Sequence, residues 1–234
     1  MLLVYHKEML STLVNELANL LFPTHCVGCE TPATYCCDTC LQKLPDAPAS
    51  PDRTILALFD YRDRRVKRLI WLLKYRGGRA VAKILADALY DRVLDEVVEI
   101  EMFQPTGDPW LLIPIPLSPQ KRRHRGFNQT EEIAKHLLRR NSRNFERGQS
   151  KGLASFDLLK RVRDERSQMS IKERAERWAN IEDAFQVTDS QAVAGRHILL
   201  IDDVTTTGAT LSEARRVLHA AGARQVFAVA VAHG

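Results

Sequence analysis

The sequence predicts an α/β fold in which a parallel sheet is covered by helices and preceded by a small cysteine-bearing module. Two C-terminal runs, Ile198–Ile201 and Val226–Val231, are apolar at every position. Strands of this kind are buried on both faces, as in parallel sheets that lie between helices. Helical periodicities alternate with strand-like runs along the rest of the chain. All five cysteines fall between Cys26 and Cys40, which indicates a separate N-terminal unit.

The length and composition are those of a globular protein with one substantial domain and an appendage. Of the 234 residues, 45% are hydrophobic and 27% are charged, close to the globular average. No apolar run reaches the ~20 residues of a membrane-spanning helix, and no secretory signal pattern is recognisable. We therefore expect a cytoplasmic protein without a membrane span.

Positive charge is concentrated in one segment. The net charge of the chain is +5. The segment from Lys121 to Arg177 has 17 Lys/Arg and 8 Asp/Glu, whereas the rest of the chain has 17 Lys/Arg and 21 Asp/Glu. Such a segment favours an anionic ligand. A pyrophosphate group and a DNA backbone both meet this description.

Two Cys-x-x-Cys pairs predict a structural zinc site in the N-terminal module. Four thiolates at ~2.3 Å complete a tetrahedron around one zinc ion and leave no open position for catalysis. The alternatives are disulfides, which a reducing compartment disfavours, or free buried thiols. Cys36 could replace Cys37, and His25 could complete a Cys₃His site. The predicted ligands are Cys26, Cys29, Cys37 and Cys40.

The module and its flanks are expected to span residues 1–50. Apolar residues at helical spacing between Leu10 and Leu21 predict an amphipathic helix that ends at Pro23. Met9 could be the true start of translation. Three prolines between Leu44 and Pro51 predict a linker, so the main domain covers residues 51–234.

The main domain is expected to alternate strands and helices. The predicted strands are Thr54–Asp60, Trp110–Ile115, His197–Ile201 and Val226–Ala232. The predicted helices are Arg64–Tyr75, Ala80–Val98, Gln129–Arg139 and Thr210–Ala221. Ligands of such sheets bind at the carboxyl ends of the strands.

The strongest chemical signal follows the strand His197–Ile201. Two adjacent carboxylates are followed by a turn rich in threonine and glycine, and then by a helix. Helix N-termini and hydroxylated loops bind phosphate, while carboxylates accept hydrogen bonds from sugar hydroxyls or lie near magnesium. We expect Asp202 and Asp203 to bind a ribose. The expected phosphate-binding residues are Thr205, Thr206, Thr207, Gly208, Ala209 and Thr210.

Two other interpretations of this segment are weaker. A Walker B strand is disfavoured because the chain has no G-x-x-x-x-G-K-[ST] motif. Simple helix capping leaves the acidic pair beside the loop unexplained. The segment resembles the motif of type I phosphoribosyltransferases that binds 5-phosphoribosyl 1-pyrophosphate (PRPP). The resemblance implies the type I phosphoribosyltransferase fold.

A second resemblance spans nearly the whole chain. Together with the cysteine pairs, four segments resemble the ComF family of competence-associated proteins, which includes GntX-type DNA-utilisation proteins. These segments are Lys74–Gly77, Pro114–Ser118, Arg125–Gln129 and Gln168–Arg174, the last together with Asn180 and Ala184-Phe185. The resemblance implies a double-zinc-ribbon-like module joined to a phosphoribosyltransferase domain, and a role in natural transformation or the use of external DNA. The polar insertion 141–152 and Met169 depart from the family pattern.

Further residues are expected to complete an anion site. A loop with Lys121–Arg123 and Arg125 precedes the helix near Asn128, and the fold implies that it binds pyrophosphate; a solvated basic face is the alternative for Lys121–Arg123. Lys74 either caps its helix or contacts phosphate. The segment 166–178 resembles a hood that closes over PRPP. The pyrophosphate and lid candidates are Lys74, Arg125, Gln129, Arg166, Gln168, Lys172 and Arg174.

Two functions remain open on the sequence alone. The first is a magnesium-dependent phosphoribosyltransferase that displaces pyrophosphate from C1 of PRPP; no general base stands out and the acceptor is unidentified. The second is a non-catalytic protein of the same fold that binds single-stranded DNA through its zinc module and basic segment. It would also bind DNA-processing partners, with PRPP or a nucleotide as ligand. Tyr35, Phe127 and Trp178 are its candidate stacking residues. The DNA role depends on the family resemblance.

Overall fold

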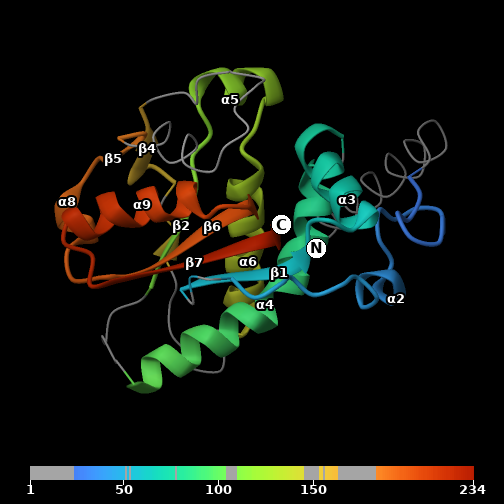
Figure 1. Cartoon of the computed structure of the whole chain (residues 1–234), viewed down its shortest axis with the longest axis horizontal. Coiled ribbons are helices and arrows are strands. Elements are labelled where there is room, and N and C mark those ends of the chain that lie inside the picture. The colour runs from blue at the N-terminus through green and yellow to red at the C-terminus, as the bar shows by residue number, and fades with distance from the viewer. Residues whose placement is uncertain are drawn as a thin grey trace, which may run out of the picture. The chain divides into compact units, whose positions relative to one another are not determined.

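Figure 1 shows the computed structural model of the chain, which divides into two units, Met1–Leu44 and Pro45–Gly234. The structure describes residues 24–50, 52, 54–76, 78–103, 110–144, 153–154, 156–162 and 183–234. The predicted N-terminal helix and Met9 lie outside the described residues. Among the described helices, none combines the length and the apolarity needed to cross a bilayer.

The described part of the first unit carries little regular structure. It contains one helix, α2 (Asp38–Leu41), and an isolated antiparallel bridge between His25 and Pro32. Glu30 and Ala33 have left-handed backbone conformations, with φ values of 60° and 64°. Tight turns of this kind bring the two cysteine pairs close together.

The second unit is built on a five-stranded sheet of order β1-β7-β6-β2-β3, in which every neighbouring pair is parallel. The prediction of a parallel sheet flanked by helices is confirmed. β4 (Leu159–Arg161) and β5 (Phe185–Val187) form a separate antiparallel pair. The five strands are β1 (Ile55–Asp60), β2 (Leu111–Pro114), β3 (Leu153–Ala154), β6 (His197–Thr205) and β7 (Gln225–His233).

Helices cover both faces of the sheet (Figure 1). On one face, Ile198 and Leu200 of β6 belong to the same buried cluster as Leu211 and Leu218. On the other face, Leu199 lies near Val93. The helices of this unit are α3 (Arg64–Tyr75), α4 (Gly78–Phe103), α5 (Pro119–Arg125), α6 (Gln129–Asn144), α8 (Ser190–Val193) and α9 (Ala209–Ala220).

Local sequence explains why α3 forms where it does. The Asp63 carboxylate accepts hydrogen bonds from the backbone N–H groups of Arg65 and Val66, which caps the helix N-terminus. Apolar residues then recur at helical spacing and form one buried stripe. This stripe consists of Val66, Leu69, Ile70, Leu72 and Leu73.

The proline-rich segment after Leu44 lies along the open edge of β1. Ala47 donates its backbone N–H to the Leu58 carbonyl, and the Asp60 N–H donates to the Pro45 carbonyl, at 3.0 and 2.9 Å. An isolated antiparallel bridge joins Asp46 to Phe59. The segment expected as a linker therefore pairs with the sheet of the second unit from Pro45 onward.

Two further elements differ from expectation. The basic segment expected as a loop is the helix α5, capped at Ser118 and ended by Gly126 with a φ of 76°. Strand β6 continues to Thr205, so the acidic pair lies within the strand rather than after it. The strand is longer because its carboxyl half still pairs with β7 up to Thr205 and His233.

Candidate functional site

The acidic pair of β6 lies in the carboxyl half of the strand, with its two carboxylates on opposite faces of the sheet. Successive strand residues alternate between faces. Asp203 lies on the face covered by α6, where its Oδ2 accepts a hydrogen bond from Gln129 Nε2 at 2.8 Å. The same Oδ2 atom lies 3.0 Å from Lys74 Nζ, at the C-terminal end of α3. Three distant segments therefore meet at one carboxylate.

Arg125 joins this group through Gln129. Its Nη1 atom donates to Gln129 Oε1 at 3.1 Å, and its guanidinium carbon lies 5.4 Å from the centre of the Tyr75 ring. Gln129 is buried, and its amide connects Arg125 to Asp203. Of the predicted site residues, the structure thus brings together Lys74, Arg125, Gln129 and Asp203.

Asp202 is enclosed by protein. Burial, followed by the neighbouring Asp203 charge, raises the pKa of Asp202 to about 8, although the backbone N–H of Asp203 and the charges of Lys74 and Arg161 oppose the shift. The Asp203 N–H donates to Asp202 Oδ1 at 2.8 Å. The site therefore holds two adjacent carboxyl groups in different environments, of which Asp203 has the cationic partner.

The turn that follows β6 has a left-handed glycine at the N-terminus of α9. Gly208 has a φ of 77° and directly precedes α9. A Cβ atom there would lie 3.3 Å from Ile55 Cδ1, so the position favours glycine on both backbone and steric grounds. Thr206 is exposed, and Thr207, Gly208 and Thr210 are half-buried. The first N–H groups of α9 lack acceptors within the helix and point towards this turn.

The segment between β2 and α6 is held in place by buried polar contacts. Asn128 Nδ2 and Thr130 Oγ1 both donate to the Ile115 carbonyl, at 3.1 and 2.8 Å. In α5, Arg122 pairs with Glu131, while Lys121 and Arg123 are exposed. Arg122 therefore links α5 to α6, which is a structural role.

The other residues predicted to contact the ligand are not among the residues that the structure describes. Arg166, Gln168, Lys172 and Arg174 lie outside the described residues, as does the rest of the expected hood at 166–178. The described boundary of this region is Asp183, whose N–H donates to Glu213 Oε1 at 2.8 Å.

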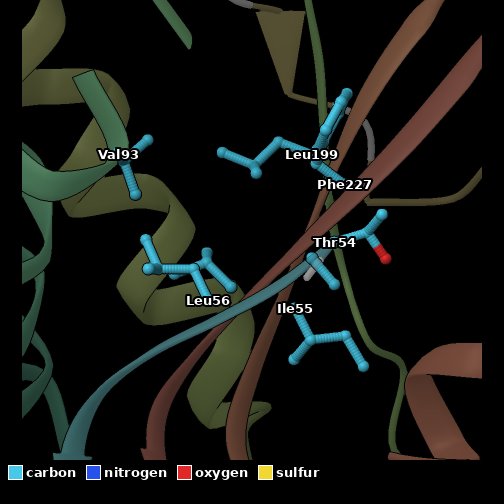
Figure 2. Close-up of a pocket in the computed structure, with 8 residues that line it drawn as sticks. Thr54, Ile55, Leu56, Val93, Leu199 and Phe227 are labelled. Atoms are coloured by element: carbon cyan, nitrogen blue, oxygen red, sulfur yellow. The ribbon is translucent and has the colours of Figure 1, made fainter. Parts of the chain in front are cut away.

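An apolar hollow of about 50 Å³ lies elsewhere, between α4 and the strands (Figure 2). Its lining includes residues near the beginnings of β1, β6 and β7, such as Thr54, Leu199 and Phe227. Pockets for small molecules commonly measure about 300–1,000 Å³. This hollow is too small for such a ligand and lies at the amino ends of the strands, away from the acidic pair.

Four cysteines of the first unit form a compact sulfur cluster that could hold a metal ion. Their Sγ atoms all lie within 4.8 Å of one another. Cys37 Sγ is 3.8 Å from Cys26 Sγ and 3.6 Å from Cys29 Sγ. A tetrahedron with ~2.3 Å bonds has edges of about 3.8 Å, so these separations fit four ligands of one ion. They are far longer than the ~2.05 Å of a disulfide bond.

The charges of the cluster also favour a cation. Burial opposes ionisation of Cys26, but hydrogen bonds from the backbone of Cys37, Gly28 and Cys29 lower the pKa of its thiol to about 6. Sharing of hydrogen bonds with Cys29, together with burial, raises the pKa of Cys40 to about 12. The four sulfurs cannot all be thiolates at neutral pH unless a positive ion joins them.

The two alternative ligands lie outside this cluster. The described residues that gather as metal ligands are Cys26, Cys29, Cys37 and Cys40, without a histidine. The buried Cys36 Sγ instead lies 3.8 Å from the Cys37 carbonyl oxygen. His25 takes part in the backbone bridge to Pro32.

Sequence reasoning did not assign the contacts of three residues at the site. Asn128 and Thr130 anchor the start of α6 to the end of β2, and Tyr75 lies against Arg125. The buried anchors had a weak signal in the sequence, since both polar residues stand next to the predicted helix start. Tyr75 belongs to the segment Lys74–Gly77 that resembles the ComF family, but its contact was not predictable because Arg125 stands 50 positions away.

Known proteins resemble this chain in both sequence and domain type. A family model described as phosphoribosyl transferase domain matches residues 75–234. The DNA utilization protein YhgH of Escherichia coli is 29% identical over 206 residues, which cover 87% of this chain and 81% of that protein. The competence protein ComFC of Streptococcus pneumoniae is 31% identical over 170 residues, covering 73% of this chain and 64% of the relative.

Among solved structures, a hypoxanthine phosphoribosyl transferase of Trypanosoma cruzi is similar with a TM-score of 0.38 and 13% identity. The match covers 64% of this chain and 63% of that one, so the chain spans less than two thirds of the solved structure. The sequence relatives confirm the resemblance to the ComF family that the motifs indicate. With the family model matched over most of its length, the chain belongs to the phosphoribosyl transferase domain family.

Proposed function

We propose that the second unit binds PRPP, or a related ribose 5-phosphate, with magnesium at the carboxyl end of β6. The observation that carries the proposal is the convergence of Lys74 and Gln129 on Asp203, next to the Gly208 turn. Asp202 and Asp203 would accept hydrogen bonds from ribose hydroxyls, and the turn 205–210 would hold the 5-phosphate. Lys74 and Arg125 would supply positive charge for the pyrophosphate.

The residues present fit such a ligand. A glycine at Gly208 leaves the space that a Cβ would fill, and the charge of Asp203 is balanced by Lys74. Magnesium, when bound, would neutralise the pyrophosphate and support its departure. Arg166, Gln168, Lys172 and Arg174 are proposed to close over the ligand, and their closure would exclude water.

Whether the unit is an enzyme depends on an acceptor. If it is one, the reaction is displacement of pyrophosphate from C1 of PRPP by a base or amine, and positioning and charge stabilisation provide most of the catalysis. Release of pyrophosphate from PRPP in the presence of a panel of bases would establish the enzyme. If PRPP binds but no base in the panel leads to release of pyrophosphate, a non-catalytic role is favoured.

Ligand binding itself is tested by thermal unfolding. PRPP with magnesium should raise the melting temperature by several degrees at a concentration ~100 times the Kd. Asp202→Asn with Asp203→Asn should abolish the shift. Asp91→Asn, an exposed change on α4, is the matched control and should keep it. An undiminished shift in the double variant would remove the ribose assignment.

We propose further that the metal of the first unit is zinc in a structural role. Four sulfur ligands leave no open coordination position. Such thiolates persist in a reducing compartment, which is consistent with a cytoplasmic location.

A second candidate function is the handling of single-stranded DNA, together with DNA-processing partners, during the use or uptake of external DNA. The relatives named for competence and DNA utilisation support this proposal.

A further inference from the structure

One face of α3 exposes two large aromatic rings. Trp71 and Tyr75 are 38% and 50% exposed, and their ring centres lie 5.8 Å apart. They stand one helical turn apart, on the side opposite the buried stripe. Single exposed apolar residues are common on protein surfaces, but two adjacent exposed rings are less so.

Cationic side chains surround these rings. The guanidinium carbons of Arg68 and Arg76 lie 4.5 and 6.0 Å from the centre of the Trp71 ring. Lys67 is exposed one turn before Trp71. We name this surface the α3 stripe, and it consists of Lys67, Arg68, Trp71, Tyr75 and Arg76.

Among the described residues, no acidic side chain forms an ion pair with a cation of the α3 stripe. The helix contains no acidic residue. Within the described part of the chain, the ion pairs of α3 join Arg65 to Asp63 and Lys74 to Asp203. Both pairs lie beside the stripe and involve none of its members.

We propose that the α3 stripe binds single-stranded nucleic acid. Unpaired bases stack on aromatic rings and on guanidinium planes, and phosphates pair with the interleaved cations. A duplex hides its bases and would meet only the cations. An acidic peptide would likewise use the cations and leave Trp71 and Tyr75 without partners. Alternation of rings and cations therefore favours an unpaired strand.

The α3 stripe ends at the phosphoribosyl site. Tyr75 follows Lys74 in the chain and lies against Arg125, which contacts Asp203 through Gln129. A strand on the stripe would therefore place its phosphates close to the residues proposed to bind pyrophosphate. The inference deepens the second candidate function and rests on it; it does not depend on PRPP binding.

The test is fluorescence anisotropy of labelled oligothymidylate and oligouridylate of equal length, with the full chain. Trp71→Ala and Tyr75→Ala should each weaken binding by about 5-fold to 150-fold, the usual range for loss of one stacked base. Trp71→Phe should restore most of the affinity. Comparison of the two oligonucleotides determines whether the strand is DNA, RNA or either.

A matched control is available on another surface. Phe156 is 36% exposed, and Lys135 Nζ lies 5.7 Å from the centre of its ring. Phe156→Ala should leave the affinity unchanged, because an isolated ring and one cation do not form a stripe. Equal losses in Phe156→Ala and Trp71→Ala would overturn the proposal.

The salt dependence of the affinity tests the contribution of the cations separately from that of the rings. Arg68→Ala with Arg76→Ala should lower the slope of log K against log salt by about 1.4, since each phosphate contact on a single strand contributes about 0.7. An unchanged slope would show that these arginines do not contact phosphate, and it would contradict the phosphate contacts proposed for Arg68 and Arg76.

Three results would overturn the α3 stripe as a whole. They are unchanged affinity in both ring variants, equal affinity for blunt duplex, and conversion of an oligomer to a monomer by Trp71→Ala, which would identify a contact between copies. The thermal shift by PRPP is measured on Trp71→Ala and should persist there. If PRPP causes no thermal shift in the wild-type protein, the phosphoribosyl proposal is contradicted, whereas the proposal that the α3 stripe binds nucleic acid is not affected.

Discussion

Lys74 Nζ lies 3.0 Å from Asp203 Oδ2. This ion pair joins the end of α3 to the second aspartate of the acidic pair, 129 positions away in the chain. The Lys74 side chain is 20% exposed and that of Asp203 is 8% exposed. At such burial, each charge depends on the other for compensation. The pair therefore couples the stability of the unit to the site proposed for PRPP.

Breaking this pair should be costly. Lys74→Met leaves the Asp203 carboxylate with Gln129 as its described partner, and we expect a loss of about 3 kcal/mol in the free energy of unfolding by urea. Lys74→Met with Asp203→Asn should recover part of this loss, because no buried charge remains uncompensated. Lys83→Met removes the exposed pair with Asp87 and should cost no more than about 0.5 kcal/mol. Similar costs for the two lysine variants would contradict a buried pair.

Stability should depend on pH through Asp202. Its pKa in the folded protein is about 8, above its unfolded value, so between pH ~4 and ~8 the folded state holds a proton that the unfolded state has lost. The stability contributed below pH ~4 is therefore lost progressively as the pH rises towards 8. Asp202→Asn cannot ionise and keeps an oxygen for the Asp203 N–H, so its advantage over the wild type should grow across this window. Parallel pH profiles of the two proteins would refute the shifted pKa.

Gly208 should be needed for anion binding and for the turn itself. Gly208→Ala introduces a Cβ at a φ of 77° and close to Ile55, which strains the turn before α9. We expect a destabilisation of about 1–2 kcal/mol and loss of the PRPP-induced thermal shift. Gly126→Ala has a similar φ, yet a Cβ there would meet no atom within 4 Å. Gly126→Ala should therefore be destabilised by its left-handed backbone conformation but should keep the PRPP-induced thermal shift, which the same melting experiment measures.

The first unit should need its metal to fold. Metal analysis under reducing conditions should return one zinc ion per chain, and a chelator should unfold the first unit while the melting of the second unit persists. The adjacent cysteines supply a matched comparison, since Cys37→Ser should lose the ion and Cys36→Ser should retain it. Equal metal contents in the two variants would show that the four-sulfur cluster is not the binding site.

Strong periodicity made the main elements predictable. The helix predicted at Arg64–Tyr75 has these bounds in the structure, because Asp63 provides a cap and the apolar stripe is regular. The strands near His197 and Val226 were also recognisable, since they are apolar throughout and buried on both faces. By contrast, β3 and β5 contain two and three residues, too few for a period to show.

The helix α5 was missed for a different reason. Its sequence has no apolar stripe, so hydrophobic periodicity gives no signal. The helix instead depends on a Ser118 cap, a proline in its first turn and the left-handed Gly126 after its last turn. These end signals are visible in the sequence and outweigh the lack of periodicity.

The candidate site was only partly predictable. Asp203, Gln129 and Lys74 were singled out by motif, but no pattern in the sequence tells which of them touch. The exposure of Trp71 and Tyr75 was equally hidden, because both belong to an apolar-rich helix and only packing separates the buried residues from the exposed ones. Contacts between distant segments depend on the register of the sheet and the helices, which local sequence does not specify.

The proline-rich segment beside β1 has a consequence for how this protein behaves in a crowded solution. An open sheet edge offers unpaired N–H and C=O groups to any extended chain, and it is a common starting point for aggregation. Here Pro45 and Ala47 already hydrogen-bond to that edge, and prolines cannot donate to a further strand. A neighbouring molecule would therefore find the Leu58 carbonyl and the Asp60 N–H already paired, so the segment blocks the carboxyl half of β1 against the addition of another strand.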